Sequence, residues 1–271
     1  MLNEILICFA VVAAIGLVAG IVLVLASRFM AVKVDERLKA IRECLPGANC
    51  GACGYTGCDG YAAALNKGEA APDLCTPGGN ETAKKLGEML GLEVGNIERK
   101  VAFVHCNGTC DACETKALYV GYPSCRGASF LYGGPNVCLC GCVGCGDCAK
   151  ECPVNAICIE DGVARIDARL CINCGMCVKT CPKKIISMVP FSARGVVLCS
   201  NTDKGAVARK ACKNACIGCK KCELNCPEKA IAVVNNLAVI DYDKCSGCGK
   251  CVENCPTHCL HTVDFPASVA K

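Results

Sequence analysis

The longest apolar stretch of the chain lies at its amino terminus. The run from Ile5 to Ala26 contains no charged side chain. A helix of that length rises roughly 33 Å, enough to cross the hydrocarbon core of a bilayer. Only Glu4 is charged before the run, so the basic start of a cleaved signal peptide is missing. The pattern predicts an uncleaved transmembrane helix within residues 1–28.

The charges that flank this stretch are asymmetric. No Lys or Arg precedes it, whereas five basic residues follow closely: Arg28, Lys33, Arg37, Lys39 and Arg42. The positive-inside rule then predicts a single-pass protein of the cytoplasmic (inner) membrane, with its amino terminus outside and all later residues in the cytoplasm. Thiols in that compartment stay reduced, which argues against disulfides.

The later apolar segments are short. Val163–Ile166 and Leu237–Ile240 are typical of strands, and both lie between cysteine-rich loops. Cysteine occurs 32 times among 271 residues, and Trp is absent. A core with so few large side chains is thin, so bound metal is expected to hold part of the fold together.

Four cysteine runs share the pattern C-x2-C-x2-C-x3-C-P, which is the bacterial ferredoxin signature. They are CVGCGDCAKECP, CINCGMCVKTCP, CIGCKKCELNCP and CSGCGKCVENCP, starting at Cys142, Cys171, Cys216 and Cys245. The first three thiolates of a run can bind three corners of one [4Fe–4S] cluster, while the fourth ligates the partner cluster. Zinc sites use two separated C-x2-C pairs, so four repeats of the full run disfavour zinc.

The four runs form two duplicated pairs. All eight cysteines of the first pair recur in the second at one constant offset, so each pair is expected to be one two-cluster ferredoxin domain. Cross-ligation then predicts four clusters, held by Cys142/Cys145/Cys148/Cys181, Cys171/Cys174/Cys177/Cys152, Cys216/Cys219/Cys222/Cys255 and Cys245/Cys248/Cys251/Cys226. Two further cysteines, Cys158 and Cys259, correspond to Ala232 and Ile185 in the other copy and are expected to be small buried residues.

A separate four-cysteine site precedes the ferredoxin runs. LPGANCGACGYTGCDGYAAAL and the Cys75 that follows it supply Cys50, Cys53, Cys58 and Cys75. The glycines let the backbone fold tightly around a cluster and offer N–H groups to its sulfurs. Zinc is the alternative here, but the neighbouring ferredoxin runs favour a fifth [4Fe–4S] cluster.

Six irregular cysteines lie between these sites: Cys106, Cys110, Cys113, Cys125, Cys138 and Cys140. Aligning VHCNG (104–108) with VLCSN (197–201) pairs Cys106 with Cys199 and leaves a 19-residue insertion in the first copy. The second copy has only Cys199 and Cys212, too few for a cubane. The hypothesis is a sixth [4Fe–4S] cluster bound by Cys106, Cys110, Cys125 and Cys138. Cys113 or Cys140 could replace one of these four ligands. The alternative is a set of inert or hydrogen-bonded thiols.

The order of these parts resembles the B subunits of Rnf complexes, membrane-bound ferredoxin:NAD⁺ oxidoreductases that pump Na⁺ or H⁺. The resemblance covers nearly the whole chain and rests on the amino-terminal anchor, the LPGANCGACGYTGCDGYAAAL segment and the runs ending in CPVNAI and CPEKAI. It implies a protein that takes electrons from soluble ferredoxin and relays them to the other membrane and NAD-binding subunits. Flavin and NAD sites would belong to those subunits, and this chain has no Walker A sequence or GxGxxG after a strand.

The expected fold class is α+β: a single amino-terminal transmembrane helix, a small four-cysteine [4Fe–4S] domain, and two tandem bacterial ferredoxin-like domains. The expected boundaries are 1–28 for the anchor, 29–95 for the four-cysteine domain, 96–140 for a cysteine-containing insertion or linker, 141–192 for the first ferredoxin domain and 193–271 for the second with its linker.

The expected function is electron relay, with no substrate-converting catalytic residue in the chain. The formal net charge of +4 is a weak indication of nucleic-acid binding, because each cluster with four thiolates brings about −2. Lys210, Lys213, Lys220 and Lys221 could steer an acidic ferredoxin or form an ordinary solvated face. The alternatives are a polyferredoxin serving a hydrogenase or a redox-sensor reducing system, a scaffold with structural clusters, and a zinc-binding interaction module.

Overall fold

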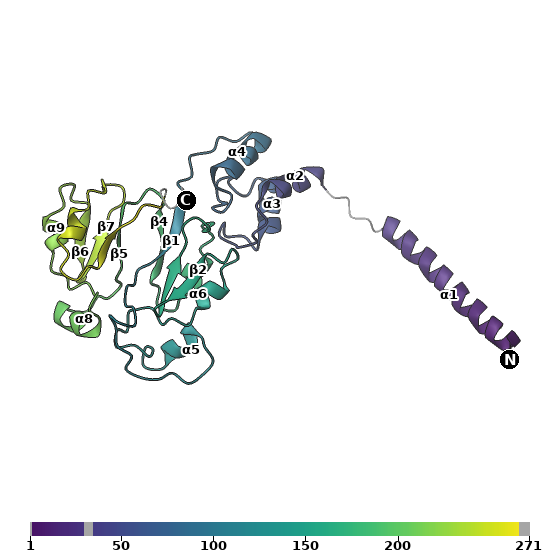
Figure 1. Cartoon of the computed structure of the whole chain (residues 1–271). Coiled ribbons are helices and arrows are strands. Elements are labelled where there is room, and N and C mark those ends of the chain that lie inside the picture. Colours follow the sequence, from purple (N-terminus) through teal and green to yellow (C-terminus); the bar gives the residue numbers. More distant parts are fainter. Residues whose placement is uncertain (1, 30–34, 266–271) are drawn as a thin grey trace. The chain divides into compact units, whose positions relative to one another are not determined.

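The structure is a computed structural model that describes residues 2–29 and 35–265. The chain divides into two compact units, residues 1–40 and residues 41–271, and each is described by itself (Figure 1). The second unit contains all the cysteine motifs.

The uncharged amino-terminal run forms the helix α1 (Leu2–Phe29). A bilayer span needs about 20 predominantly apolar residues in one helix. In the part of the chain that the structure describes, no helix meets the requirement of length and apolar character for crossing a membrane. The expected transmembrane helix within residues 1–28 is therefore wrong, and so is the fold class that included it. The single-pass placement in the inner membrane, with the amino terminus outside, is corrected for the same reason.

Three helices lie along the sequence near the four-cysteine motif: α2 (Glu36–Cys44), α3 (Cys58–Lys67), which begins at the third cysteine of the motif, and α4 (Gly79–Leu90). The apolar faces of the last two are buried, with Tyr61 and Leu65 on α3 and Leu86 on α4. Gly68 ends α3 in the left-handed conformation, at φ 76°, where a residue with a Cβ would be strained. This turn brings the chain back toward Cys75, so that the motif closes on itself.

Each ferredoxin unit contains two antiparallel two-stranded sheets (Figure 1). The first unit pairs β1 (Lys100–Val104) with β4 (Ile186–Pro190) and β2 (Ile157–Glu160) with β3 (Val163–Ile166). The second pairs β5 (Gly195–Val197) with β8 (Leu260–Thr262) and β6 (Ile231–Val234) with β7 (Leu237–Ile240). Both strands predicted from the sequence, at 163–166 and 237–240, are confirmed with the same bounds.

Strand register supports the duplication and the placement of the insertion. Val104 lies opposite Ile186, and Val197 lies opposite Leu260. Ile186 and Leu260 are separated by the same offset as the duplicated cysteines, whereas the offset from Val104 to Val197 is larger by the length of the insertion. Strand β1 falls within the 96–140 segment, so this segment contributes an outer strand to the first ferredoxin unit.

The remaining helices are short: α5 (Cys125–Phe130), α6 (Asp147–Lys150), α7 (Met176–Thr180), α8 (Gly205–Ala211), α9 (Lys221–Leu224) and α10 (Lys250–Glu253). The buried core consists mainly of Val, Ile, Ala and Cys side chains, with Val163, Val189 and Val196 fully buried. A two-stranded sheet is marginally stable by itself. The fold therefore depends on what fills the spaces between the cysteines.

Candidate metal centres

Each ferredoxin run places its third cysteine in one of the short helices. These cysteines are Cys148 in α6, Cys177 in α7, Cys222 in α9 and Cys251 in α10. The residue before each helix has a positive φ, between 60° and 79°, and three of the four are glycines. This left-handed turn reverses the chain between the second and third cysteines, so that the short triplet curls around one space.

The first ferredoxin unit has two such spaces. One cavity, with about 340 Å³ free of protein atoms, is lined by Cys142, Cys148 and Cys181. The other, with about 320 Å³, is lined by the four cysteines Cys152, Cys171, Cys174 and Cys177. In both cases the Pro-flanked cysteine of one run lies with triplet cysteines of the other run, two in the first cavity and all three in the second, as cross-ligation requires.

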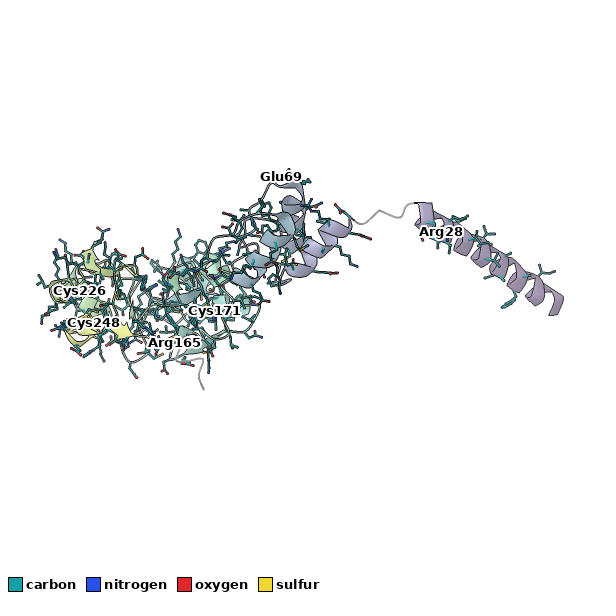
Figure 2. All side chains as sticks on the ribbon, turned by 90° about the horizontal axis from the view of Figure 1, so that it is seen from above. Arg28, Glu69, Arg165, Cys171, Cys226 and Cys248 are labelled. Atoms are coloured by element: carbon teal, nitrogen blue, oxygen red, sulfur yellow. The ribbon has the colours of Figure 1, made fainter. Side chains whose placement is uncertain are left out.

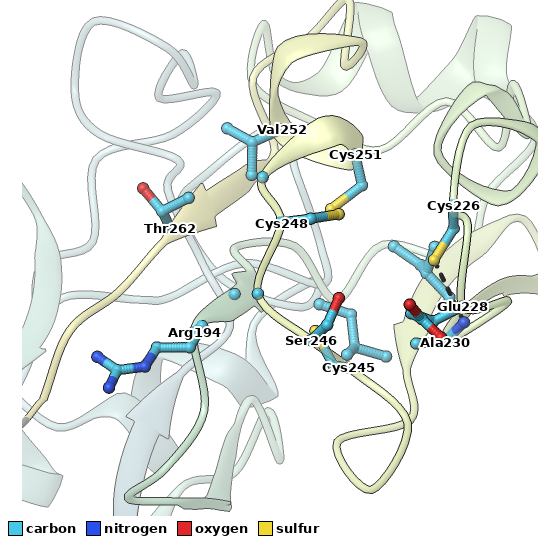
Figure 3. A pocket seen from close by; sticks show the side chains of 15 residues that line it. Arg194, Cys226, Glu228, Ala230, Cys245, Ser246, Cys248, Cys251, Val252 and Thr262 are labelled. Atoms are coloured by element: carbon cyan, nitrogen blue, oxygen red, sulfur yellow. Dashed lines mark hydrogen bonds between the residues drawn. The ribbon is translucent and has the colours of Figure 1, made fainter.

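The second ferredoxin unit has the same arrangement of cysteines. Cys226, Cys245, Cys248 and Cys251 surround a cavity with about 460 Å³ free of protein atoms (Figure 3). Cys226 Sγ accepts a hydrogen bond of 3.3 Å from the Ala230 N–H, and Cys152 Sγ accepts one of the same length from Ala156. Figure 2 shows Cys226 and Cys248 in this unit, apart from Cys171 in the first. The four cysteines of the other set in this unit also lie close together. The pKa of Cys222 is raised chiefly by burial, and the charges of the other three, Cys216, Cys219 and Cys255, raise it further.

The four-cysteine motif is likewise gathered. The pKa of the Cys75 thiol is raised chiefly by burial, and the nearby charges of Cys58, Cys50 and Cys53 raise it further. This site adjoins the first ferredoxin unit, since Thr76 Oγ1 donates a 3.0 Å hydrogen bond to the Asn173 carbonyl. Burial raises the pKa of Cys174, and among the cysteine charges that raise it further, that of Cys50 has the largest effect. The two cysteine sets are therefore neighbours.

Two of the most buried thiols in the first ferredoxin unit, Cys148 and Cys177, are poorly suited to being free thiolates. Burial raises the pKa of Cys148 to about 12 and that of Cys177 to about 11, and the neighbouring cysteines add to both shifts. Among the described residues, no three His, Cys, Asp or Glu side chains are gathered closely enough to hold one metal ion. The cysteines instead line shared cavities between the binding loops. Cationic iron would compensate the repulsion between thiolates, and its binding would release protons.

The structure separates the four cysteines expected to bind a sixth cluster. Cys106 and Cys138 line one cavity. Cys110 is exposed, and its Sγ lies beside Gly162. Cys125 lies instead in the cavity of Cys142, Cys148 and Cys181. The cavity of Cys106 and Cys138 is also lined by Cys113, Cys140, Cys142, Cys199 and Cys212.

Cys259 is a buried thiol that lies beside two expected ligands. From the sequence it was expected only to be a small buried residue. It lies 3.6 Å from Cys255, Sγ to Sγ, and hydrogen-bonds Cys216 as well. These hydrogen bonds lower the pKa of Cys255 to about 4 and that of Cys216 to about 6. A donor to ligand sulfurs stabilises the more negative, reduced form of a cluster and so raises its potential.

Replacing Cys259 with isoleucine, the residue at the equivalent position 185 of the first ferredoxin unit, is expected to lower the potential of the neighbouring cluster by about 40 mV. A thiol has one S–H to donate, so one hydrogen bond of ~1 kcal/mol is lost, and one electron is transferred. Redox titration followed by electron paramagnetic resonance measures the shift. Cys158→Ala, which removes an exposed thiol hydrogen-bonded to Glu160, is the control. An unchanged or raised potential in Cys259→Ile would contradict this role.

Three family models match the chain. An Fe–S cluster family matches residues 45–77, and two 4Fe-4S dicluster domain families match residues 141–185 and 208–256. The matches include the four-cysteine motif and both ferredoxin units. The presence of [4Fe–4S] domains predicted from the sequence is thereby confirmed.

Curated relatives match almost the full length. The chain is 44% identical over 245 residues, 90% of this chain and 74% of the relative, to the B subunit of the Na⁺-translocating ferredoxin:NAD⁺ oxidoreductase complex of Acetobacterium woodii. It is 40% identical to the B subunit of the proton-translocating ferredoxin:NAD⁺ oxidoreductase complex of Clostridium ljungdahlii, over 89% of this chain and 85% of the relative. It is 38% identical to the B subunit of the ion-translocating oxidoreductase complex of Methanosarcina acetivorans, over 87% and 89%.

Proposed function

The chain belongs to the B-subunit family of ion-translocating ferredoxin:NAD⁺ oxidoreductase (Rnf) complexes, and we propose from this premise that it relays single electrons from soluble ferredoxin to partner subunits. Five [4Fe–4S] clusters would hold the electrons, on the cysteine sets that begin at Cys50, Cys142, Cys171, Cys216 and Cys245. The protein's own contribution is to position the clusters and to set their potentials through burial and hydrogen bonds.

The observation that carries this proposal is the contact between the four-cysteine site and the first ferredoxin unit. Besides burial, the charge of Cys50 raises the pKa of Cys174, and Thr76 donates a hydrogen bond to the loop that contains Cys174. A cluster used only as a structural staple needs no such neighbour. Electron transfer requires it, because each cluster must pass its electron to the next.

The second ferredoxin unit is suited to receive electrons. Its Cys219 and Cys248 are exposed, whereas every expected ligand in the first unit is buried or partly buried. Exposed Lys210, Lys220 and Lys221 lie close to Cys219 in the sequence. Positive charge beside an accessible cluster raises the encounter rate with an acidic ferredoxin. Electrons would then leave from the Cys50 site toward the partner subunits.

Replacing Cys53 with alanine is expected to abolish transfer from reduced ferredoxin to NAD⁺ in the assembled complex, because the last cluster of the relay loses a ligand. Ferredoxin should still bleach the remaining clusters of the variant. NADH formation and visible absorbance measure the two steps. Cys44→Ala is the matched control, since the Cys44 thiol contacts Met89 Sδ at 3.5 Å and lies outside the expected ligand sets.

Intact NAD⁺ reduction by the Cys53→Ala complex would refute this exit route. If ferredoxin fails to bleach even the unaltered chain, the polyferredoxin alternative with a different donor is favoured.

A further inference from the structure

We propose that Cys106, Cys138, Cys199 and Cys212 bind a sixth [4Fe–4S] cluster between the two ferredoxin units. The set keeps two of the ligands expected from the sequence and takes the other two from the second copy. It rests on the proposed function only in that the chain assembles iron–sulfur clusters at all.

The space between these four cysteines has the size of the spaces at the ferredoxin motifs. All four line one cavity with about 360 Å³ free of protein atoms. The three cavities at ferredoxin motifs have between about 320 and 460 Å³. An ideal Cβ on Gly108 would lie 3.5 Å from Cys106 Sγ and 3.6 Å from Cys212 Sγ, so thiols of the two copies approach the same point.

The four sulfurs have matching hydrogen-bond donors in the two copies. Cys106 Sγ accepts from the backbone N–H groups of Gly108, at 3.4 Å, and Cys142, at 3.3 Å. Cys199 Sγ accepts from the equivalent N–H groups, those of Asn201 at 3.4 Å and Cys216 at 3.3 Å. Backbone N–H groups aimed at sulfur favour a thiolate, as they do around iron–sulfur sites.

The second pair of sulfurs repeats this equivalence. Cys138 accepts from the backbone of Cys140, and Cys212 accepts from the backbone of Asn214. Cys140 and Asn214 each stand two positions after their cysteine, so they occupy equivalent places in the two copies. Because an asparagine takes this position in the second copy, we assign Cys140 the role of backbone donor and leave its thiol out of the ligand set.

Two further thiols line the cavity: Cys142, an expected ligand in the first ferredoxin unit, and Cys113. Only Cys113 lies outside the ferredoxin runs. It hydrogen-bonds the Cys212 thiol directly. A single tetrahedral metal with bonds of about 2.3 Å already separates its thiolates by about 3.8 Å, and the larger cubane separates them further. Two thiols within hydrogen-bond reach therefore do not occupy two corners of one cubane. Cys212 has an equivalent cysteine in the first copy, Cys138, whereas Cys113 lies in the insertion, so we leave Cys113 out of the ligand set. Its own S–H donates to the Ala211 carbonyl at 3.4 Å.

Polar contacts between the copies hold the cavity together. Asn214 Nδ2 donates to the Asn107 carbonyl at 2.8 Å, and Ser200 Oγ donates to the His105 carbonyl at 2.8 Å. Asn201 is 1% exposed, and its Nδ2 lies 3.8 Å from Cys138 Sγ. A buried amide directed at a thiol is a further donor to a ligand sulfur. The site thus joins the first unit to the second.

Iron and acid-labile sulfide counted on the full chain, assembled anaerobically, test the proposal without any activity measurement. The unaltered chain should hold about 24 irons, from six clusters of four. Cys199→Ala and Cys212→Ala should each hold about 20, as should Cys106→Ala and Cys138→Ala. The controls Cys113→Ala and Cys158→Ala should match the unaltered chain.

An unaltered chain with about 20 irons would overturn the site, whatever the variants do. Full iron in Cys199→Ala and Cys212→Ala, or loss of a cluster in Cys113→Ala, would overturn the ligand set. The count is independent of the relay: a chain with all six clusters that does not accept electrons from ferredoxin would refute the proposed function alone.

Discussion

The double variant Cys148→Ala/Cys181→Ala is expected to hold as much iron as either single variant, about four irons fewer than the unaltered chain. Cys148 and Cys181 belong to different sequence runs but line the same cavity. If both ligate one cluster, its loss through the first substitution leaves nothing for the second to remove.

The matched control is Cys148→Ala/Cys152→Ala. These two cysteines are close neighbours in the same run, yet Cys152 lines the cavity of Cys171, Cys174 and Cys177. This pair should lose two clusters, about eight irons. Iron and sulfide counts on anaerobically purified chains distinguish four from eight directly.

The opposite pattern would contradict cross-ligation. If the Cys148/Cys181 pair loses twice the iron of a single variant while the Cys148/Cys152 pair does not, each run holds its own cluster. Loss of two clusters in both double variants would show that the whole ferredoxin unit collapses. A spectrum of each single variant separates that case, since the partner cluster should remain.

The grouping of cysteines at the ferredoxin runs could be predicted because the information for it is local. A triplet with this regular spacing curls around one space wherever a left-handed residue such as Gly146 or Gly175 precedes the third cysteine. The duplication then located the short strands, since apolar residues recur between equivalent loops. The insertion in the first copy also followed from sequence, and the register of Val104 and Val197 agrees with it.

The set at the Cys106 cavity was not predictable in the same way. Within the second copy alone, only Cys199 and Cys212 are available for such a site. Contacts between the copies bring these two thiols to Cys106 and Cys138. The symmetric donors Gly108 and Asn201 were a usable signal, because they follow Cys106 and Cys199 at the same spacing.

Cys158 and Cys259 show the limits of comparing copies. Both were expected to be buried because apolar residues stand at the equivalent positions. Cys259 is buried, but Cys158 is exposed on β2. Side chains alternate between the two faces of a strand, and one face of this two-stranded sheet is open to solvent. The equivalent Ala232 on β6 is exposed as well, so the two copies agree in burial, and apolar character alone did not predict it.

Removing the iron is expected to unfold the ferredoxin units. Their strands form four separate two-stranded sheets, and their buried clusters of side chains contain many cysteines. Such sheets are marginal by themselves, and metal binding becomes folding free energy where the ligands are otherwise unpaired. With ~10 kcal/mol from metal binding, the melting temperature should fall by more than about 20 °C.

Circular dichroism and hydrogen exchange on the full chain, before and after oxidative removal of iron under chelator, measure this change. Exchange should rise most in β2, β3, β6 and β7, which lie between the cysteine runs. Reassembly with iron and sulfide should restore protection, which separates metal loss from irreversible damage. A metal-free chain that melts cooperatively within ~5 °C of the loaded one, a difference of only about 2 kcal/mol, would show that packing alone holds the fold. The clusters would then serve electron transfer without supporting the structure.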